Sequence, residues 1–145
     1  MAVRLSSGSH RTKNHSELRP TAARTLESVF GILADEIEGR RVLDLYCGVG
    51  SYGILALRRG AASAVFVDNS RDAEKRALKA IAQFHLEGNA VMFREEVTHF
   101  LHSAERELHQ YDLVFIDPPY QMVAPGPVIL EILDAKEKKA KKRTR

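Results

Sequence analysis

Apolar residues in this chain follow two patterns, short continuous runs and helical spacings of three and four. The short runs at residues 41–46, 64–67, 90–93 and 111–116 predict strands. The stretches between them carry apolar residues at helical spacing and predict helices. Strands that alternate with helices of this length are typical of an α/β fold with a parallel, doubly wound sheet. Such sheets bind ligands at the carboxyl ends of their strands.

Helix boundaries are predicted from capping residues and glycines. Thr21 is the expected N-cap of a first helix that ends at Gly39, and its apolar positions are Leu26, Val29, Phe30, Leu33 and Ile37. The next helix follows a turn at Gly48–Gly53 and stops at Gly60. Apolar positions predict two more helices, at 73–82 and 97–108, and a short one at about 128–133.

Charge is distributed unevenly along the chain. The net charge is +3, but residues 136–145 carry +6, residues 1–24 carry +4, and the stretch between them carries −7. Basic ends on an acidic body indicate a phosphate-rich partner held beside an acid-lined site. The alternative is that the lysine-rich tail is solvated and inert.

Length and composition restrict the class of protein. A chain of 145 residues is about one domain long. It has no apolar run of about 18 residues and no secretory signal, so we expect a cytoplasmic protein and no membrane partner. Cys47 is the one cysteine, which excludes an internal disulfide and fits a reducing compartment.

A glycine turn follows the first predicted strand. Gly48–Gly53 has the pattern G-x-G-x-x-G, with Asp68 at the end of the next strand as a candidate partner for ribose hydroxyls. The pattern fits nicotinamide and flavin dinucleotides as well as S-adenosylmethionine. Asp44 favours S-adenosylmethionine, because a carboxylate near the turn suits a cation better than a pyrophosphate. Its alternative role is to cap the turn.

The last predicted strand leads into Asp117-Pro118-Pro119-Tyr120. Proline donates no backbone hydrogen bond, so carbonyls in this loop stay free to accept. Pro118 also biases Asp117 to an extended conformation. An acceptor carboxylate, free carbonyls and an aromatic ring suit a planar base with an amino group, so the segment indicates chemistry on an exocyclic amine.

Other candidate residues have ordinary explanations beside functional ones. Glu95 and Glu96 end the third strand and could accept from an adenine amine, or they could be solvated surface acids. Cys47 is better explained as a small buried residue than as a nucleophile. His99 and His102 share a helix face but have no obvious third ligand, so we predict no metal site.

These motifs together resemble the RsmD family of bacterial methyltransferases. The likeness extends from residue 4 to about 120 and rests on several matched positions: Arg4, Gly8, Arg11, Arg19-Pro20-Thr21, Arg24, Glu27, Phe30, Asp44–Gly50, Ala56–Ala61 and Phe115–Tyr120. The chain departs from the family at Gly31, usually Asn, at Cys47–Gly50, usually Ala-Gly-Ser-Gly, and at Asp68, usually Glu. The family also continues for about two further strand and helix units.

The resemblance implies a Rossmann-like class I methyltransferase fold over residues 21–134, between a basic arm at 1–20 and a basic tail at 135–145. It implies methylation, by S-adenosylmethionine, of the N2 amine of a guanine in 16S ribosomal RNA, free or in the small-subunit particle. The cofactor residues that it implies are Asp44, Gly48, Gly50, Asp68 and Glu96. The implied catalytic residues are Asp117, Pro118, Pro119 and Tyr120, and the implied RNA-binding residues are Arg11, Arg19 and Arg24.

Three other functions remain open on the sequence. A dinucleotide oxidoreductase would use the glycine turn but would not need Asp117–Tyr120. A methyltransferase of a DNA base or a protein glutamine would use both motifs. A chain without the last strands of the family could also be a non-catalytic protein that only binds RNA.

Overall fold

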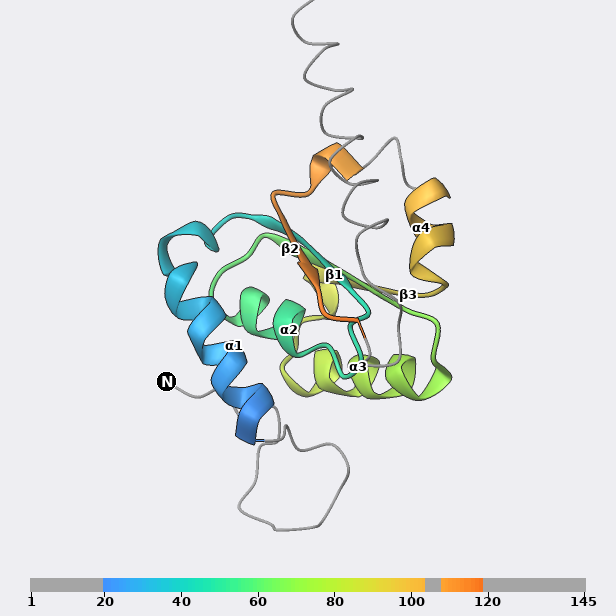
Figure 1. Cartoon of the computed structure of the whole chain (residues 1–145), viewed down its shortest axis with the longest axis horizontal. Helices are drawn as coiled ribbons and strands as arrows, with labels where there is room; N and C mark the ends of the chain where they lie inside the picture. Colours follow the sequence, from blue (N-terminus) through green and yellow to red (C-terminus); the bar gives the residue numbers. More distant parts are fainter. Residues whose placement is uncertain (1–19, 104–107, 119–145) are drawn as a thin grey trace, which may run out of the picture.

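The predicted strands form one parallel sheet in a computed structural model that describes residues 20–103 and 108–118. The strands are β1 (Arg41–Leu45), β2 (Ser63–Asp68), β3 (Ala90–Arg94) and β4 (Leu113–Ile116), in the order β3-β2-β1-β4. This order confirms the predicted α/β sheet (Figure 1). The predicted arm, the helix at 128–133 and the basic tail lie outside the described residues.

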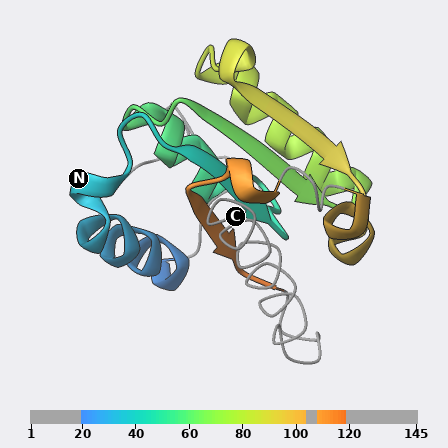
Figure 2. The ribbon, with the colours of Figure 1, turned by 90° about the horizontal axis from the view of Figure 1, so that it is seen from above.

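Four α-helices connect or flank the strands in the described part of the chain. They are α1 (Pro20–Ile32), α2 (Ser51–Arg58), α3 (Arg71–Gln83) and α4 (Val97–Ser103). Short 3-10 turns follow at 34–36, 87–89 and 108–110. Figures 1 and 2 show α2 and α3 side by side, while α4 is set apart from them. The described sheet therefore has helices on both faces.

Alternate residues of each strand enter two different cores. Asp44 of β1 is in register with Phe66 of β2 and Phe115 of β4, so these side chains share one face of the sheet. The apolar side chains of that face pack with Phe30 of α1 and Ile54 of α2. The opposite face packs against α4, through Leu43, Leu45, Val67, Val97, Phe100 and Leu101. Since both faces of β1 and β2 are covered, these strands are nearly continuous apolar runs, whereas Val91 and Phe93 of the edge strand β3 are exposed.

The predicted bounds of the first helix are wrong at both ends. The helix begins at Pro20, so Thr21 lies inside it and is not its N-cap. It ends at Ile32, and a 3-10 turn carries the chain to Ile37, which is 1% exposed. The spacing from Leu33 to Ile37 looked helical because a 3-10 turn also brings a residue back to the core after about one turn.

The glycine turn is shorter than predicted. Tyr46 leaves β1 with a left-handed φ of 55°, and Gly50, with φ 84°, is the N-cap of α2. Helix α2 begins at Ser51, so Gly53 is helical rather than part of the turn. Asp44 stabilises this early helix start, because its carboxylate accepts from the N–H of Gly53 in the first turn.

Candidate active site

A cavity of about 420 Å³ lies at the carboxyl end of the sheet. Its size is in the range of small-molecule sites, about 300–1,000 Å³. Its walls come from the ends of β1, β2 and β4 and from the start of α3, and are formed by Tyr46, Gly48, Val49, Asp68, Asn69, Ser70, Asp72, Ala73, Arg76 and Asp117. The structure therefore brings Gly48, Asp68 and Asp117 together, three residues that the sequence assigned to one site.

Gly48 forms the part of the cavity wall where the backbone is exposed. Its φ is 55°, and a Cβ atom there would meet nothing within 4 Å. Its N–H donates to Oδ2 of Asp68 over 3.0 Å. Glycine is favoured here for its left-handed backbone rather than for lack of space.

Gly50 and Gly53 are limited by space, although Gly50, with φ 84°, also has the left-handed backbone of Gly48. A Cβ atom on Gly53 would lie 2.3 Å from Cε1 of Phe66, and one on Gly50 would lie 3.2 Å from the same atom. Neither glycine lines the cavity. The two glycines therefore let α2 approach β2 closely, the packing role expected of a later glycine in such a motif.

Asp68 is oriented by the backbone on both sides. Its Oδ2 accepts from Gly48 and its Oδ1 accepts from the N–H of Ser70 over 2.9 Å. Ser70 is the N-cap of α3, and its hydroxyl accepts from the N–H of Ala73. A carboxylate oxygen can accept more than one hydrogen bond, so Asp68 keeps acceptor capacity toward the cavity.

Asp44 lies behind the glycine turn and is 1% exposed. Its Oδ2 accepts from the N–H of Gly53 over 3.0 Å, so the capping role considered for this residue is present in the structure. Burial raises the pKa of Asp44 to about 8; the Gly53 hydrogen bond opposes the rise, and the charges of Asp117 and Asp68 add to it. Asp44 does not line the cavity.

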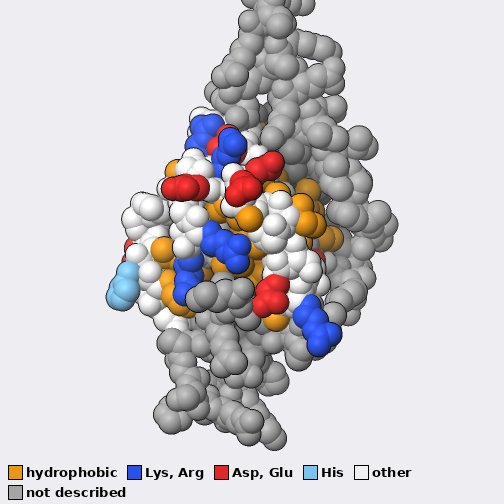
Figure 3. Space-filling view, turned by 90° about the vertical axis from the view of Figure 1, so that its left-hand side faces the viewer, with side chains coloured by type: hydrophobic (Ala, Val, Ile, Leu, Met, Phe, Trp, Pro, Cys, Tyr) orange, Lys and Arg blue, Asp and Glu red, His pale blue; other side chains and the backbone are white. Residues whose placement is uncertain are grey.

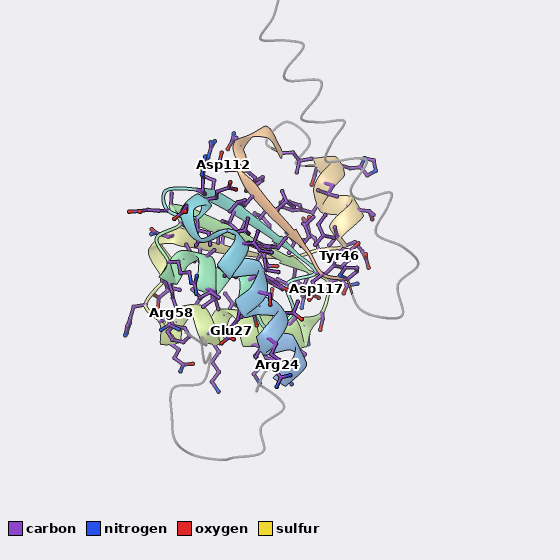
Figure 4. The ribbon with its side chains drawn as sticks, turned by 60° about the vertical axis from the view of Figure 1, so that its left-hand side comes forward. Arg24, Glu27, Tyr46, Arg58, Asp112 and Asp117 are labelled. Atoms are coloured by element: carbon purple, nitrogen blue, oxygen red, sulfur yellow. The ribbon has the colours of Figure 1, made fainter. Side chains whose placement is uncertain are left out.

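Asp117 is exposed beyond the end of β4 and lines the cavity. Figure 4 shows Asp117 and Tyr46 at the same end of the sheet, with Asp112 at the opposite end of β4. Pro118 is described and half-buried, whereas Pro119 and Tyr120 lie outside the described residues. Of the predicted amine-binding segment, the structure therefore places the carboxylate and the first proline.

Glu96 does not line the cavity but contacts a residue that does. It accepts a hydrogen bond from the side-chain amide of Asn69. Glu95 points to His99, with 3.6 Å between Oε2 and Nδ1. Within 20–103 and 108–118 no group of three histidine, cysteine or acidic residues could hold a metal.

Cys47 is 8% exposed, and its sulfur lies 3.9 Å from the sulfur of Met92. Burial raises the pKa of its thiol, and the charges of Asp44 and Asp68 raise it further. The thiolate needed for nucleophilic attack is thus disfavoured. This geometry favours the interpretation of Cys47 as a small buried residue.

Several residues of the cavity wall were not predicted from the sequence. Tyr46 lines the cavity, and its hydroxyl is buried without a hydrogen bond in the described part of the chain. Asn69, Asp72 and Arg76 come from the segment after β2, where Arg76 and Asp72 form an ion pair of 3.0 Å. The available signal for Tyr46 and Asn69 was their position directly after a strand end, whereas Asp72 and Arg76 lie in the first two turns of α3.

Arg24 is exposed on α1, whereas Arg11 and Arg19 lie outside the described residues. The N-terminal end of α1, which carries Arg24, is the end of that helix nearer to Asp117 (Figure 4). The surface on this side mixes Lys and Arg side chains with acidic and apolar ones (Figure 3). Of the three arginines predicted to contact RNA, the structure therefore describes Arg24 alone, toward the end of α1 that is nearer to Asp117.

No helix in the described part of the chain is long and apolar enough to span a bilayer.

Comparisons with known proteins agree with this architecture. Ribosomal RNA small subunit methyltransferase D of Escherichia coli strain K12 is 33% identical over 104 residues, which are 72% of this chain and 50% of that protein. The chain spans about half the length of the curated relatives it matches.

Solved structures share the fold. A hypothetical protein of Thermus thermophilus aligns with a TM-score of 0.70 and 25% identity, over 92% of this chain and 78% of that one. The C-terminal domain of precorrin-6Y C5,15-methyltransferase from Rhodobacter capsulatus aligns with a TM-score of 0.64 at 16% identity, over 80% and 58%. A putative methyltransferase of Escherichia coli aligns with a TM-score of 0.58 and 28% identity, over 77% of this chain and 58% of that one, so the expected methyltransferase fold is confirmed.

A family profile matches almost the whole chain. It covers residues 4–141 and describes conserved hypothetical protein 95. The match and the similarity to the Escherichia coli protein confirm the resemblance inferred from the motifs. The chain therefore belongs to the conserved hypothetical protein 95 family, which is the RsmD family.

Proposed function

We propose that this chain transfers the methyl group of S-adenosylmethionine to the exocyclic N2 amine of a guanine in 16S ribosomal RNA. The observation that most directly supports this is that Gly48, Asp68 and Asp117 line one cavity. Family membership supports methyl transfer to ribosomal RNA, since the Escherichia coli relative is named for that activity. The guanine N2 amine is the target that the resemblance implies.

The residues of the cavity fit S-adenosylmethionine, which carries an adenosine and two positive groups. Asp68 has acceptor capacity for the ribose hydroxyls. Asn69, held by Glu96, can serve the adenine edge, so Glu96 acts through its neighbour. Asp44 and Gly50 support the turn from behind, and the carboxylate of Asp68 suits a cation.

When bound, the cofactor supplies an electrophilic methyl group on sulfur. The acceptor amine is weakly nucleophilic because its lone pair is conjugated with the base. A hydrogen bond from the amine to Asp117, and a second to a carbonyl at Pro118 or Pro119, would favour a pyramidal nitrogen with a localised lone pair. In this mechanism the loop contributes position and electrostatics, and Tyr120 stacks on a base turned out of its helix.

RNA contacts are proposed for Arg11, Arg19 and Arg24 and for the basic tail. Such contacts would hold phosphates, which gives affinity but little choice of sequence. The substrate would be free ribosomal RNA or the small-subunit particle, in the cytoplasm. Weakening of RNA binding with salt would be expected for this kind of contact.

The proposal is tested by labelled methyl transfer with the full chain and Asp117→Ala. We expect Asp117→Ala to abolish methyl transfer to small-subunit RNA while the affinity for S-adenosylmethionine stays nearly unchanged. Asp35→Ala is the matched control, because Asp35 is an exposed aspartate outside the cavity. Unchanged turnover in Asp117→Ala would contradict the role of Asp117, and label in DNA or protein instead of RNA would contradict the substrate.

A further inference from the structure

Helix α3 carries three basic residues on the side away from the sheet. The side of α3 that packs on the sheet is buried, and its residues are Ala73, Ala77 and Ile81. Arg71, Lys75 and Lys79 are exposed, and they follow one another at intervals of four residues. Residues at this spacing share one helix face, and here that face is nearly opposite the buried one. The three side chains therefore form an outward row about 12 Å long, which we call the cationic ridge.

Neighbouring acids do not pair with the cationic ridge in the described part of the chain. The acids of α3 pair with other arginines instead. Oδ2 of Asp72 lies 3.0 Å from Nε of Arg76, and Oε1 of Glu74 lies 3.9 Å from a guanidinium nitrogen of Arg94 on β3. Within residues 20–103 and 108–118, no ion pair involves a residue of the ridge. Its three positive charges are therefore available to a partner of opposite charge.

The other helices that the structure describes have no such ridge. Helix α4 contains no lysine or arginine, and Arg24 is the one basic residue of α1. Helix α2 ends in Arg58, whose guanidinium lies 4.3 Å from the centre of the Phe84 ring. A row of unpaired cations is thus particular to α3 and is not a general property of the helical surfaces described.

The cationic ridge begins at the cavity and leads away from it. Ser70 and Asp72, on either side of Arg71, line the cavity, whereas Arg71, Lys75 and Lys79 do not. Positive charges at intervals of about 6 Å along a helix suit an extended polyanion better than a small ligand that fills the cavity. S-adenosylmethionine carries no phosphate, so the cofactor itself gives these cations no partner.

We propose that the cationic ridge binds the phosphodiester backbone of the RNA substrate beside the cavity. This inference rests on the proposed function, because it takes ribosomal RNA as the partner. Lysine and arginine are usual partners of RNA phosphates, and such contacts fix where the RNA lies without selecting its sequence. The ridge holds the RNA on the β2 side of the cavity, whereas Asp117 lies on the β4 side.

The salt dependence of RNA binding tests the ridge without any methyl transfer. The full chain and the triple variant Arg71→Gln, Lys75→Gln, Lys79→Gln are titrated with small-subunit ribosomal RNA at several salt concentrations. We expect the plot of log Kd against log salt concentration to lose about two to three units of slope, because each phosphate contact contributes about 0.7 to 0.9. Each single variant should lose about one unit.

A second triple variant separates charge from shape. Arg71→Lys, Lys75→Arg, Lys79→Arg keeps all three charges and should bind RNA with the slope of the wild type. Both triple variants should unfold at the wild-type midpoint, because the positions are exposed and glutamine, lysine and arginine all favour helix. Both should also bind S-adenosylmethionine as the wild type does, since no residue of the ridge lines the cavity.

Three results would overturn the proposal. The first is a glutamine variant with the slope of the wild type, and the second is an equal loss of RNA affinity in the charge-keeping variant. The third is a glutamine variant that loses affinity for polyglutamate but not for RNA, since the ridge would then bind an acidic protein segment.

Failure of the proposed function gives a different result. If Asp117→Ala keeps full turnover while the glutamine variant loses slope, the role of Asp117 fails and the ridge remains an RNA-binding surface. If Asp117→Ala abolishes methyl transfer while the slope of the glutamine variant is unchanged, the ridge fails and the proposed chemistry remains.

Discussion

The two halves of the cavity are built in different ways. The half formed by β1 and β2 is fixed by backbone hydrogen bonds, from Gly53 to Asp44 and from Gly48 and Ser70 to Asp68. The half formed by β4 ends in Asp117, which is exposed and comes two residues after Phe115, whose ring stacks on Tyr52. In the described residues the acids of the first half are held by backbone hydrogen bonds, whereas the carboxylate of the second half is exposed.

This difference follows from how each carboxylate is solvated. Asp44 is buried, Asp68 is half-buried, and Asp117 is exposed, although all three are at or near the carboxyl ends of adjacent strands. Burial makes Asp44 a structural acid that is mostly protonated at neutral pH. We infer that ligand chemistry falls to the two less buried acids, since those line the cavity and Asp44 does not.

The largest expected effect concerns pH and Asp44. Its pKa is about 8 when folded against a usual 3.8, so the folded state holds a proton that the unfolded state releases between these values. The contribution of Asp44 to the free energy of unfolding is therefore greatest below pH 4 and declines as pH rises toward 8. We expect Asp44→Asn, which cannot ionise, to gain on the order of 3 kcal/mol relative to wild type between pH 5 and pH 8.

Urea unfolding of both proteins at several pH values measures this difference. Asp35→Asn is the control, because Asp35 is exposed and should show no such gain. A constant difference between Asp44→Asn and wild type would mean that Asp44 is already ionised in the folded protein. The contrast between a structural acid and two ligand acids would then be lost.

The next effect concerns the contact between α2 and β2. Gly53→Ala would place a Cβ atom 2.3 Å from the ring of Phe66, which must shift. We expect a loss of about 2 kcal/mol in the free energy of unfolding, as for other overpacked cores. Gly88→Ala is the control, since a Cβ atom there meets nothing within 4 Å.

The double variant Gly53→Ala, Phe66→Leu sharpens the test. If the cost arises from this contact, the two changes should not add, because the smaller side chain makes room for the methyl group. Thermal unfolding measures the losses of stability in the two single variants and the double variant. If the losses add, the cost of Gly53→Ala does not arise from its contact with Phe66.

A smaller effect is expected from substitution of Asp68. Its influence on cofactor affinity can be compared directly with that of Asp117 in the other half of the cavity. Asp68→Ala removes the acceptor that Gly48 and Ser70 orient. We expect the affinity for S-adenosylmethionine to fall about tenfold, the value of one hydrogen bond to a charged group. Asp117→Ala should leave that affinity nearly unchanged, and calorimetric titration of the two variants checks both expectations. Equal losses of affinity in Asp68→Ala and Asp117→Ala would show that both halves of the cavity bind the cofactor.

The sequence was sufficient to predict the four strands, the presence of a glycine turn after the first of them, and the strand-end acids, but not where the turn ends. Buried parallel strands are continuous apolar runs, and ligand groups follow strand ends, so Asp68 and Asp117 could be assigned from local order. The contact of Gly53 with Phe66 could not be predicted, nor could the stacking of the Tyr52 ring on that of Phe115. They depend on which residues the register of the sheet brings together across long separations in the chain.

The smallest expected effect lies at the far end of β4. The carboxylate of Asp112 accepts from the N–H of Arg41 over 2.9 Å and from its guanidinium over 3.3 Å, and these contacts lower the pKa of Asp112. They join β4 to β1 at the end away from Asp117 (Figure 4).

We expect Asp112→Ala to lose about 1 kcal/mol of stability. Because its pKa is lowered, that loss should shrink as pH falls below the usual 3.8. Methyl transfer per folded molecule in Asp112→Ala should match the wild type. The two aspartates that flank β4 would then differ, because Asp112 contributes to stability and Asp117 to chemistry. A loss of turnover in Asp112→Ala that exceeds its unfolded fraction would show that the position of Asp117 depends on the whole length of β4.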